Sequence, residues 1–523
     1  MIQYTVVLAS RVLVVSTLSP QVALYIPLCV LKYSTTMKVI SDAKDIQQWF
    51  QDRRWALSAN KIDNNNKCRA NKIYFPRTAQ QVSQILQETP NVPVACIGGA
   101  HESSNVALCC CADNEDHDDA LVLDFSHMDA IQVDDGRKTI MVEPGVRFRA
   151  LAEAVSKANG ALPIGTGPDV GVFGFVLNGG LSGYFSKRLG LLGQRVVRLE
   201  IVTANGDIHQ ISPEQQQQSQ VFTCLLGAGS ALAVVTSITF QMEDASIFQG
   251  GGQMVVVPCG GEMMTPTKTF CKDTLVFMRD VVMNDDSVAM ELVVTSDLTC
   301  IATFIFYDSF SGDKESFVAP VRGFAARSGL DIAVDNVTQW TCWMEAASCL
   351  WPILSEIKGD LLVTLQHCCG TKGLPSDKVL DFIVDKWLGE SALQLAPMSI
   401  IEARTLGGAI HDKRELPTGN FHHSFFVDSI VMYDAESVPI EDRKQISDKT
   451  ASLLQAGKNV ESLTVDFSGT HSQPDDQGHS AIGRDIFGSE ASFQNILAVK
   501  TRLDPQNRFR FHPFVSILSK NTE

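Results

Sequence analysis

The stretch Val94-Ala95-Cys96-Ile97-Gly98-Gly99-Ala100-His101 decides the fold of this chain. Its first four residues are small or apolar, as in a short buried strand, and they run directly into a glycine turn that ends in a histidine. Successive free N–H groups in such a turn form a concave site that suits an anion such as a pyrophosphate. A lone histidine after a turn is more often a surface or capping residue, so the assignment of a site depends on the rest of the chain.

Strands and helices alternate on both sides of this turn, from Lys72 to about Met242. Thr78-Ala79-Gln80-Gln81 fits a capping box for a helix, and the apolar residues that follow it recur with helical spacing. The pattern predicts an α+β domain. Its further strands are expected at 121–124, 140–143, 196–203 and 233–241, and a further helix at 147–159.

Glycine is concentrated in one part of this domain. Ten of the 37 glycines fall between Gly160 and Gly193, and a smaller group is Gly227-Ala228-Gly229. Glycine is favoured where a ligand or another backbone lies against the main chain, so the stretch predicts such a close approach. A Rossmann dinucleotide site would need a helix after the turn, whereas Ala233–Phe240 has the composition of a strand, which argues against that fold.

The composition of the chain restricts which ligands and partners it can bind. The 523 residues carry 43 Lys and Arg against 59 Asp and Glu, a formal charge of −16, so no basic surface favours nucleic acid or an anionic bilayer. An anionic ligand would be held by backbone dipoles. The 14 cysteines include the run Cys109-Cys110-Cys111 but no C-x-x-C pair, and no metal site is expected.

The N-terminal residues 1–37 are expected to be a secretory leader or a non-structural extension. The uncharged run Val12–Leu31 is interrupted by polar residues and two prolines, which makes a stable membrane span improbable. The single sequon Asn336-Val337-Thr338 can be explained by one chance match, and the N-terminal segment slightly favours secretion or an endomembrane lumen over other locations. The oligomeric state is left open.

We expect three structural parts after this leader. Residues 38–243 form the domain described above, and residues 244–460 form a second domain with an antiparallel sheet covered by helices, since longer apolar runs there alternate with helical stretches. Residues 461–523 return to complete the first domain.

An ordered set of motifs resembles the flavin-linked oxidases of the vanillyl-alcohol-oxidase superfamily, most closely the berberine-bridge-enzyme-like branch. The resemblance covers about Lys72 to Val515. The motifs that carry it are Phe75-Pro76-Arg77-Thr78, Gly98-Gly99-Ala100-His101, Val142-Glu143-Pro144-Gly145, Leu162-Pro163-Ile164-Gly165, Val170-Gly171-Val172, Gly179-Gly180, Leu226-Gly227-Ala228-Gly229, Phe421-His422-His423 and Leu503-Asp504-Pro505-Gln506-Asn507-Arg508-Phe509.

This resemblance implies a two-subdomain PCMH-type FAD-binding domain, with FAD attached through an 8α-histidyl bond at His101. A covalent bond of this kind makes a flavin a stronger oxidant. By the same resemblance, Asn507 contacts the flavin ring and Val170 admits dioxygen. The remaining cofactor-binding residues are expected at Gly98, Gly99, Ala100, Glu102 and Ser103 around the pyrophosphate, and at Gly179, Gly180 and Val234 along the flavin and adenine.

Two departures from the family pattern affect the chemistry. Gly167 occupies the position of the cysteine that bicovalent members attach to flavin, so a single covalent link is expected. Asp466-Phe467 occupies the position of an Asn-Tyr pair whose tyrosine acts as the catalytic base in many members. The remaining candidates for a base are Asp466, Glu402, His422 and His423, and each has an ordinary structural alternative. Direct hydride loss without a base is a further alternative.

The function implied is an FAD-dependent oxidase that transfers a hydride from a small organic substrate, a secondary metabolite or a carbohydrate, to FAD. Dioxygen then reoxidises the flavin and gives hydrogen peroxide, and a cyclisation can be coupled to the oxidation. The alternatives are a redox-neutral cyclase, a non-catalytic flavin-binding scaffold, or a dehydrogenase with a non-oxygen acceptor. The sequence does not identify the substrate.

Overall fold

The computed structural model divides the chain into two compact units, Met1–Lys38 and Val39–Glu523. In the first unit, strands β1 (Val7–Leu8) and β2 (Arg11–Val12) form an antiparallel hairpin, and most of the predicted leader lies outside the described residues. The structure describes residues 7–8, 11–12, 37–54, 57–58, 68–101, 106–110, 120–215, 218–259, 263–354, 362–390, 393–434, 437–465 and 486–512. None of the helices within these ranges is long and apolar enough to cross a membrane.

A four-stranded sheet carries the glycine turn. Its strand order is β3 (Lys38–Ile40), β5 (Lys72–Phe75), β7 (Leu121–Asp124), β6 (Val94–Ile97), and β5 and β6 both run parallel to the central β7. Parallel strands are usually buried on both faces, which agrees with the apolar composition of β6 and β7. Strand β6 ends at Ile97, so the predicted strand and the start of the turn are confirmed.

Helix α2 (Ala79–Glu88) begins where the capping box predicts. The Thr78 hydroxyl accepts a hydrogen bond from the Gln81 amide at 3.2 Å, which satisfies one of the free N–H groups of the first turn. A capping box also predicts that the Gln81 side chain accepts a hydrogen bond from the Thr78 amide. Here it accepts from the Arg77 amide instead. The apolar stripe Val82, Ile85 and Leu86 is buried as expected.

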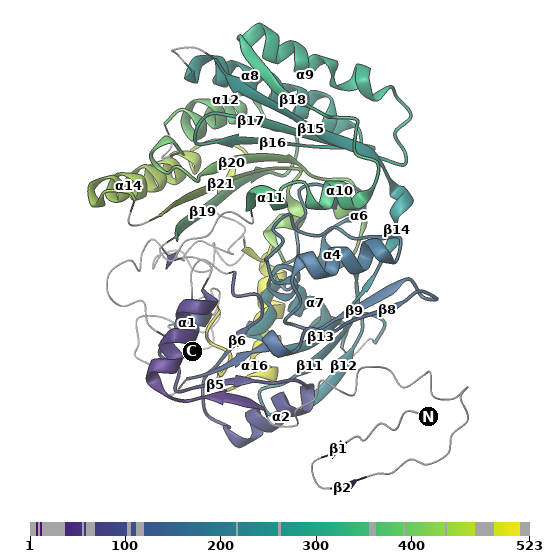
Figure 1. Ribbon diagram of the computed structural model, residues 1–523, viewed down its shortest axis with the longest axis vertical. Helices are drawn as coiled ribbons and strands as arrows, with labels where there is room; N and C mark the ends of the chain where they lie inside the picture. The colour runs from purple at the N-terminus through teal and green to yellow at the C-terminus, as the bar shows by residue number, and fades with distance from the viewer. Residues whose placement is uncertain are drawn as a thin grey trace. The chain divides into compact units, whose positions relative to one another are not determined.

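A second sheet of five antiparallel strands packs near the first (Figure 1). Its order is β12 (Ile208–Ile211), β11 (Val196–Val202), β13 (Val234–Gln241), β9 (Thr139–Val142), β8 (Ile131–Asp134). Helices α4 (Phe148–Lys157) and α7 (Ser219–Ala228) contribute buried apolar side chains to its core. After Gly229 the chain makes a short 3₁₀ turn and enters β13, so the helix required by a Rossmann site is indeed missing.

The third sheet has nine strands among the described residues, and its strands run antiparallel to their neighbours except β4, which runs parallel to β19. Helices α8 (Met264–Asp280), α9 (Lys314–Ser328) and α12 (Asp377–Phe382) cover one face and share an apolar core with it (Figure 1). The strands in order are β18 (Leu330–Asp335), β15 (Phe248–Pro258), β17 (Cys300–Tyr307), β16 (Val288–Thr295), β20 (Ile400–Thr405), β21 (Phe425–Asp434), β19 (Leu362–Thr371) and β22 (Thr464–Val465), with β4 (Leu57–Ser58) beside β19.

The opposite face of this large sheet is turned toward the other two sheets. Ile305 and Tyr307 of β17 and Phe426 of β21 belong to the core built around the five-stranded sheet. The Tyr307 hydroxyl donates to the carbonyl oxygen of Tyr184 at 2.5 Å and so joins the glycine-dense segment to the sheet. Lys187, also in that segment, donates to the carbonyls of Val282, Asp285 and Val288.

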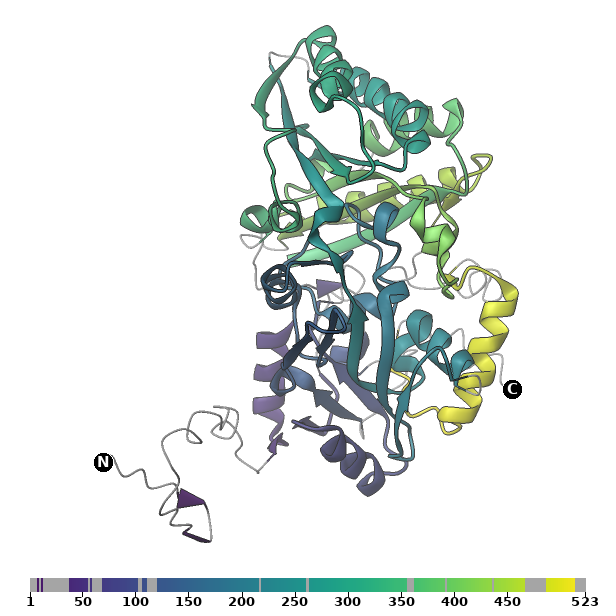
Figure 2. The same cartoon turned by 90° about the vertical axis from the view of Figure 1, so that its right-hand side faces the viewer.

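Helix α16 (Glu490–Leu503) packs beside α7, and the residues after it return to the four-stranded sheet (Figure 2). The amide of Val94 in β6 donates to the carbonyl of Arg508 at 2.9 Å. The far end of the chain is therefore held next to the strand that leads into the glycine turn.

Candidate active site

The glycine turn at the end of β6 is built by close contact with a second backbone segment. A Cβ on Gly99 would lie 2.4 Å from the Cα of Gly171, and a Cβ on Gly98 would lie 2.7 Å from the carbonyl oxygen of Pro144. Ala100 has a φ of +56°, a left-handed conformation that turns the chain sharply. These contacts leave room for glycine alone at positions 98 and 99, as expected for a cradle formed by main chain.

His101 follows this turn and is held as a neutral imidazole. Burial is the main cause that lowers the pKa of His101 to about 4, and the nearby positive charge of Arg147 acts in the same direction. Arg147 donates to the carbonyl of Asp169 at 2.6 Å and forms an isolated β-bridge with Gly171. A neutral imidazole has a free lone pair, which is the form that can attack an electrophilic carbon.

Asn507 lies in the C-terminal segment, next to Arg508, whose carbonyl oxygen accepts from the Val94 amide at the start of β6. Its φ is +50°, and its side-chain Oδ1 is buried without a hydrogen-bond partner among the described residues. A buried carbonyl oxygen of this kind is costly unless a ligand donates to it. Arg508 anchors the segment, since its guanidinium donates to the carbonyls of Leu86, Thr89, Val92 and Ala204.

Three glycines of the glycine-dense stretch, together with Gly227 and Gly488, lie close to one loop of the chain itself. A Cβ on Gly179 would lie 2.8 Å from Thr418 Cγ2, and one on Gly227 would lie 2.2 Å from the carbonyl oxygen of Pro417. We call residues 413–422 the docking loop, because it packs against several glycines at positions where a Cβ would collide with it. These glycines are Gly179, Gly190, Gly193, Gly227 and Gly488. Protein packing therefore explains part of the glycine content that the sequence alone related to a ligand.

The other predicted cofactor residues lie within or beside this framework. Gly179 and Gly180 have φ values of +95° and +80°, and Val234 is buried in β13 opposite Val202. Val170 is half-buried, and its Cγ2 would stand 2.7 Å from a Cβ on Gly167. Glu102 and Ser103 lie outside the described residues.

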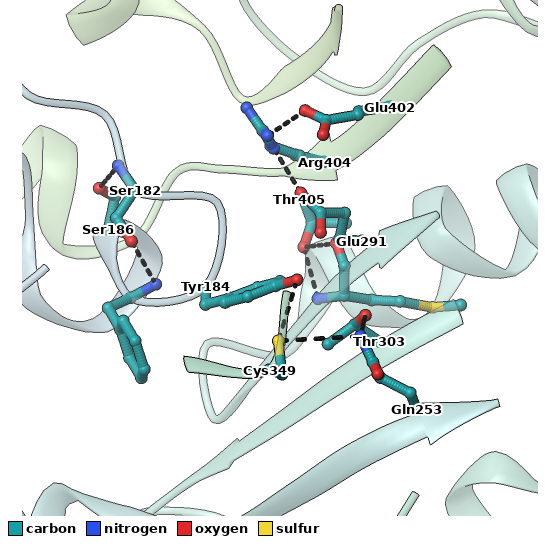
Figure 3. Close-up of polar contacts among 12 residues, drawn as sticks. Ser182, Tyr184, Ser186, Gln253, Glu291, Thr303, Cys349, Glu402, Arg404 and Thr405 are labelled. Carbon is teal, nitrogen blue, oxygen red and sulfur yellow. Dashed lines mark hydrogen bonds and ion pairs between the residues drawn. The ribbon is translucent and has the colours of Figure 1, made fainter. Parts of the chain in front are cut away.

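A buried polar patch of the large sheet includes Glu291, Glu402 and Arg404, whose polar contacts Figure 3 shows. Arg404 on β20 donates through Nε to Glu291 Oε1 on β16 at 2.5 Å, and through Nη2 to Glu402 on its own strand. Glu402 and Glu291 are 4% and 1% exposed. Because Arg404 also lies against Gly183, the patch adjoins the glycine-dense segment.

Among the predicted base candidates that the structure describes, Glu402 has the pKa that differs most from its ordinary value. Burial raises the pKa of Glu402 to about 8; Arg404 lowers it, and the negative charges of Glu291 and Asp428 raise it. A carboxyl group that titrates near neutral pH is suited to accept and release a proton. The alternative of an ordinary exposed strand residue is wrong, because Glu402 is buried.

The two histidine candidates lie in the docking loop and the residue after it. His422 ends a 3₁₀ turn, Gly419–His422, and its Nε2 lies 3.7 Å from Glu415 Oε1. His423 is buried with Nδ1 2.7 Å from the Gly419 carbonyl, and burial lowers its pKa to about 4. Asp466 and Phe467 lie outside the described residues.

Four polar members of this region were not predicted from the sequence: Tyr184, Glu291, Arg404 and Asp428. The Tyr184 hydroxyl accepts from Cys349 Sγ at 3.6 Å, and burial followed by the charges of Cys349 and Glu291 raises its pKa well above the usual value. A usable signal was present, since Glu291 is a single charge inside an otherwise apolar run and Glu402 and Arg404 alternate along a strand. Within the described residues, no three His, Cys, Asp or Glu side chains are arranged to hold a metal ion.

Comparison with known proteins agrees with this geometry. Residues 70–212 match the family model described as an FAD binding domain. An FAD-linked oxidoreductase of Dictyostelium discoideum is 28% identical over 173 residues, which cover 33% of this chain and 35% of that protein. The matched segment thus spans about a third of the length of such relatives.

Solved structures match over nearly the whole chain. A glucooligosaccharide oxidase from Acremonium strictum, whose FAD is described as 6-S-cysteinyl and 8α-N1-histidyl, has a TM-score of 0.70 at 17% identity and covers 90% of this chain and 95% of its own. A berberine bridge enzyme variant described as a reticuline dehydrogenase has a TM-score of 0.69 at 15% identity, covering 92% and 96%. Residues 70–212 therefore form an FAD-binding domain like that of FAD-linked oxidoreductases, and the chain as a whole has the same fold as these solved structures.

Proposed function

We propose that this protein is an FAD-dependent oxidase whose FAD is attached covalently to His101. The single observation that carries the proposal is the cradle: the Gly98–His101 turn, packed on Gly171 and followed by a neutral imidazole, lies within an FAD-binding domain. The orphaned, buried Oδ1 of Asn507 offers a further acceptor for a bound ring system. The residues that are present thus fit the cofactor.

The tether at His101 is supported by chemistry and by likeness. An imidazole that stays neutral at physiological pH keeps the lone pair needed to bond a flavin methyl carbon. A solved structure of the same fold has an 8α-histidyl link. Gly167 offers no thiol for a second link, so one covalent bond is proposed here.

The bound flavin would supply a hydride acceptor that dioxygen reoxidises to give hydrogen peroxide. The chain's own residues hold the substrate between the polar patch of the large sheet and the cofactor. Glu402 takes the proton that the substrate loses, because its carboxyl group titrates near neutral pH and Arg404 stabilises its ionised form. Val170, beside the turn, is proposed to leave a path for dioxygen.

The substrate is proposed to be a small secondary metabolite or a carbohydrate, with cyclisation as an outcome that can follow oxidation. Support comes from the names of the similar proteins, which include a glucooligosaccharide oxidase and a reticuline dehydrogenase. The buried patch adds polar groups that can orient a hydroxyl or an amine, among them Gln253 and Thr303, whose side chains are 3.3 Å apart.

The tether is tested by denaturing the purified protein in acid and measuring flavin in the precipitate by absorbance and by peptide mass. We expect yellow precipitate and a flavin mass on the peptide that contains His101. His101→Ala should release all flavin to the supernatant, whereas His209→Ala, a change at an exposed histidine on β12, should not. Flavin that stays soluble in the wild type would contradict the covalent bond.

The oxidase activity is tested by mixing the protein with candidate alcohols, amines and sugars without oxygen, followed by admission of air. We expect bleaching of the flavin, rapid return of colour in air and formation of peroxide. Turnover with persistent colour would favour the redox-neutral cyclase, and slow return of colour would favour a dehydrogenase. Absence of both bleaching and turnover across the panel would favour a non-catalytic scaffold.

A further inference from the structure

A pair of arginine side chains lies beside the glycine turn, although the chain as a whole carries a formal charge of −16. The first is Arg53, the last residue of helix α1 (Ala43–Arg53). Its Nη2 donates to the carbonyl oxygen of Gly98 at 2.6 Å, and its Nε lies 2.9 Å from Oδ2 of the fully buried Asp124. Because Asp124 is the strand partner of Ile97 at the end of β6, this ion pair holds the start of the turn. The charge of Arg53 is therefore matched by a buried carboxylate.

Arg147 is the second arginine, and it directly precedes helix α4. It forms an isolated β-bridge with Gly171, whose backbone packs on Gly99 of the turn. Its Nη1 donates to the main-chain carbonyl of Asp169 at 2.6 Å, and among the described residues its guanidinium forms no ion pair with a carboxylate. The Asp169 residue is exposed, so water screens the charge of its side chain. In contrast to Arg53, Arg147 thus lacks a buried anionic partner in the part of the chain that the structure describes.

The two guanidinium groups and the imidazole of His101 lie within electrostatic reach of one another. Burial lowers the pKa of Arg147, and the positive charge of Arg53 lowers it further. The carboxylates of Asp169 and Asp124 act in the opposite direction, each with a smaller effect than Arg53. Burial also lowers the pKa of His101, and the charge of Arg147 adds to that effect. Holding like charges together away from water raises the free energy of the empty site, and a bound anion removes this cost.

The guanidinium of Arg147 has hydrogen-bond donors that the protein does not use. Nη1 donates to the carbonyl of Asp169, and among the described residues Nε and Nη2 donate to no protein group. A guanidinium binds phosphate through two parallel N–H···O bonds, and such charge-assisted bonds are stronger than neutral ones. The oxidised flavin ring is neutral, so the anionic part of FAD is its diphosphate. The main-chain N–H groups of the turn supply partial charges to such a ligand, whereas Arg147 adds a full one.

We propose that Arg147 binds the diphosphate of FAD through its Nε and Nη2 groups, beside the Gly98–His101 turn. Arg53, whose charge Asp124 already matches, holds the turn in place. The inference rests on the FAD-binding domain and is independent of the oxidase reaction and of the covalent bond. It also makes the site selective among flavins, because a flavin without the diphosphate gains nothing from Arg147.

The test uses the full-length His101→Ala protein, freed of FAD by dialysis against potassium bromide, so that affinities can be measured. Three probes divide the cofactor: FAD itself, ADP-ribose, which has the diphosphate without the flavin ring, and riboflavin, which has the ring without phosphate. Quenching of flavin fluorescence reports FAD and riboflavin, and displacement of FAD reports ADP-ribose. Arg147→Gln in this background should weaken FAD and ADP-ribose by about tenfold and leave riboflavin within about twofold. If the wild-type flavin is not covalent, the same titrations apply to the chain with His101 in place.

Two further variants separate charge from structure. Arg147→Lys keeps the charge and should lose no more than about threefold in FAD affinity. Arg137→Gln, on the exposed turn between β8 and β9, is the matched control and should change none of the three affinities. Unchanged FAD affinity in Arg147→Gln, or equal weakening of riboflavin and ADP-ribose, would overturn the proposal.

The salt dependence of FAD binding decides the outcome where a fragment of the cofactor binds too weakly to titrate. Added salt screens an ionic contact, so FAD affinity should fall less with salt in Arg147→Gln than in its parent. An equal fall in the two proteins would overturn the proposal. Diphosphate binding as expected in a protein that oxidises no substrate would contradict the proposed oxidase function alone.

Discussion

The main chains of Gly99 and Gly171 approach so closely that a Cβ on Gly99 would lie 2.4 Å from the Cα of Gly171 and 2.4 Å from its amide nitrogen. The contact joins the turn after β6 to the segment before helix α5 (Val172–Val176). Because both sides of the contact are backbone, no side-chain rotation can relieve an added methyl group. The position of His101 depends on this contact, two residues away in the chain.

Gly99→Ala is therefore expected to lower the free energy of unfolding by about 1–3 kcal/mol and to reduce the fraction of protein with covalent flavin. Urea unfolding and the flavin-to-protein absorbance ratio measure the two effects. Gly174→Ala is the matched control, because a Cβ there meets nothing within 4 Å and the residue lies in helix α5. That control should change stability by less than about 1 kcal/mol, in the stabilising direction. A Gly99→Ala protein with normal stability and full flavin would show that the contact is not required.

Glu402→Gln should remove a pH dependence from both stability and catalysis. Burial raises the pKa of Glu402 to about 8 from an ordinary value of 4.5, so between these values the folded protein holds a proton that the unfolded chain has released. The folded state binds more protons in this window, and its stability therefore falls as the pH rises from about 5 to 8.

A glutamine has no proton to lose, so the variant should lose less stability than the wild type over that range. Thermal unfolding at pH 5 and pH 8 measures the difference, and Glu153→Gln on the exposed side of helix α4 provides the control. If Glu402 is the base, flavin reduction by substrate should also rise with pH toward about 8 in the wild type and be about a hundredfold slower in Glu402→Gln. If stability and flavin reduction depended on pH in the same way in the wild type and in Glu402→Gln, Glu402 would be neither the titrating group nor the base.

Arg508→Lys should loosen the C-terminal segment that presents Asn507. The guanidinium donates to four backbone carbonyls from two separate segments, residues 86–92 and Ala204, and a lysine can reach only some of them from a single nitrogen. Carbonyls left buried without a donor should cost about 2–4 kcal/mol in unfolding free energy. Arg510→Lys is a suitable control, because among the described residues Arg510 donates locally, to the carbonyl of Asn507. A wild-type urea midpoint for Arg508→Lys would contradict this anchoring role.

Local patterns were sufficient to predict the elements that carry the cofactor site. The strand Val94–Ile97, the turn after it and the start of helix α2 follow from short-range preferences, and the structure confirms them. The polar patch required knowledge of which strands are neighbours. Glu291 and Arg404 are 113 residues apart in the chain and meet only because β16 pairs with β20, a register that periodicity does not encode.

The glycine-dense stretch shows a second limit of prediction from sequence. Its composition correctly predicts a close approach of the backbone, yet composition does not say what approaches. The docking loop, residues 413–422, lies against several of these glycines, although it is far from them in the chain. Glycine permits contact with a ligand and with another chain segment for the same steric reason.

Gly227→Ala tests the packing role of these glycines apart from the cofactor. A Cβ at this position would lie 2.2 Å from the carbonyl oxygen of Pro417 and 2.6 Å from its Cγ, so the docking loop must move. Thr418 of the same loop lies against Gly179, and His422 lies against Gly488, so the displacement should spread to both contacts. We expect a loss of about 1–3 kcal/mol in unfolding free energy and faster hydrogen exchange of the loop amides, with covalent flavin retained. Loss of flavin with unchanged loop exchange would instead mean that Gly227 acts on the cofactor directly.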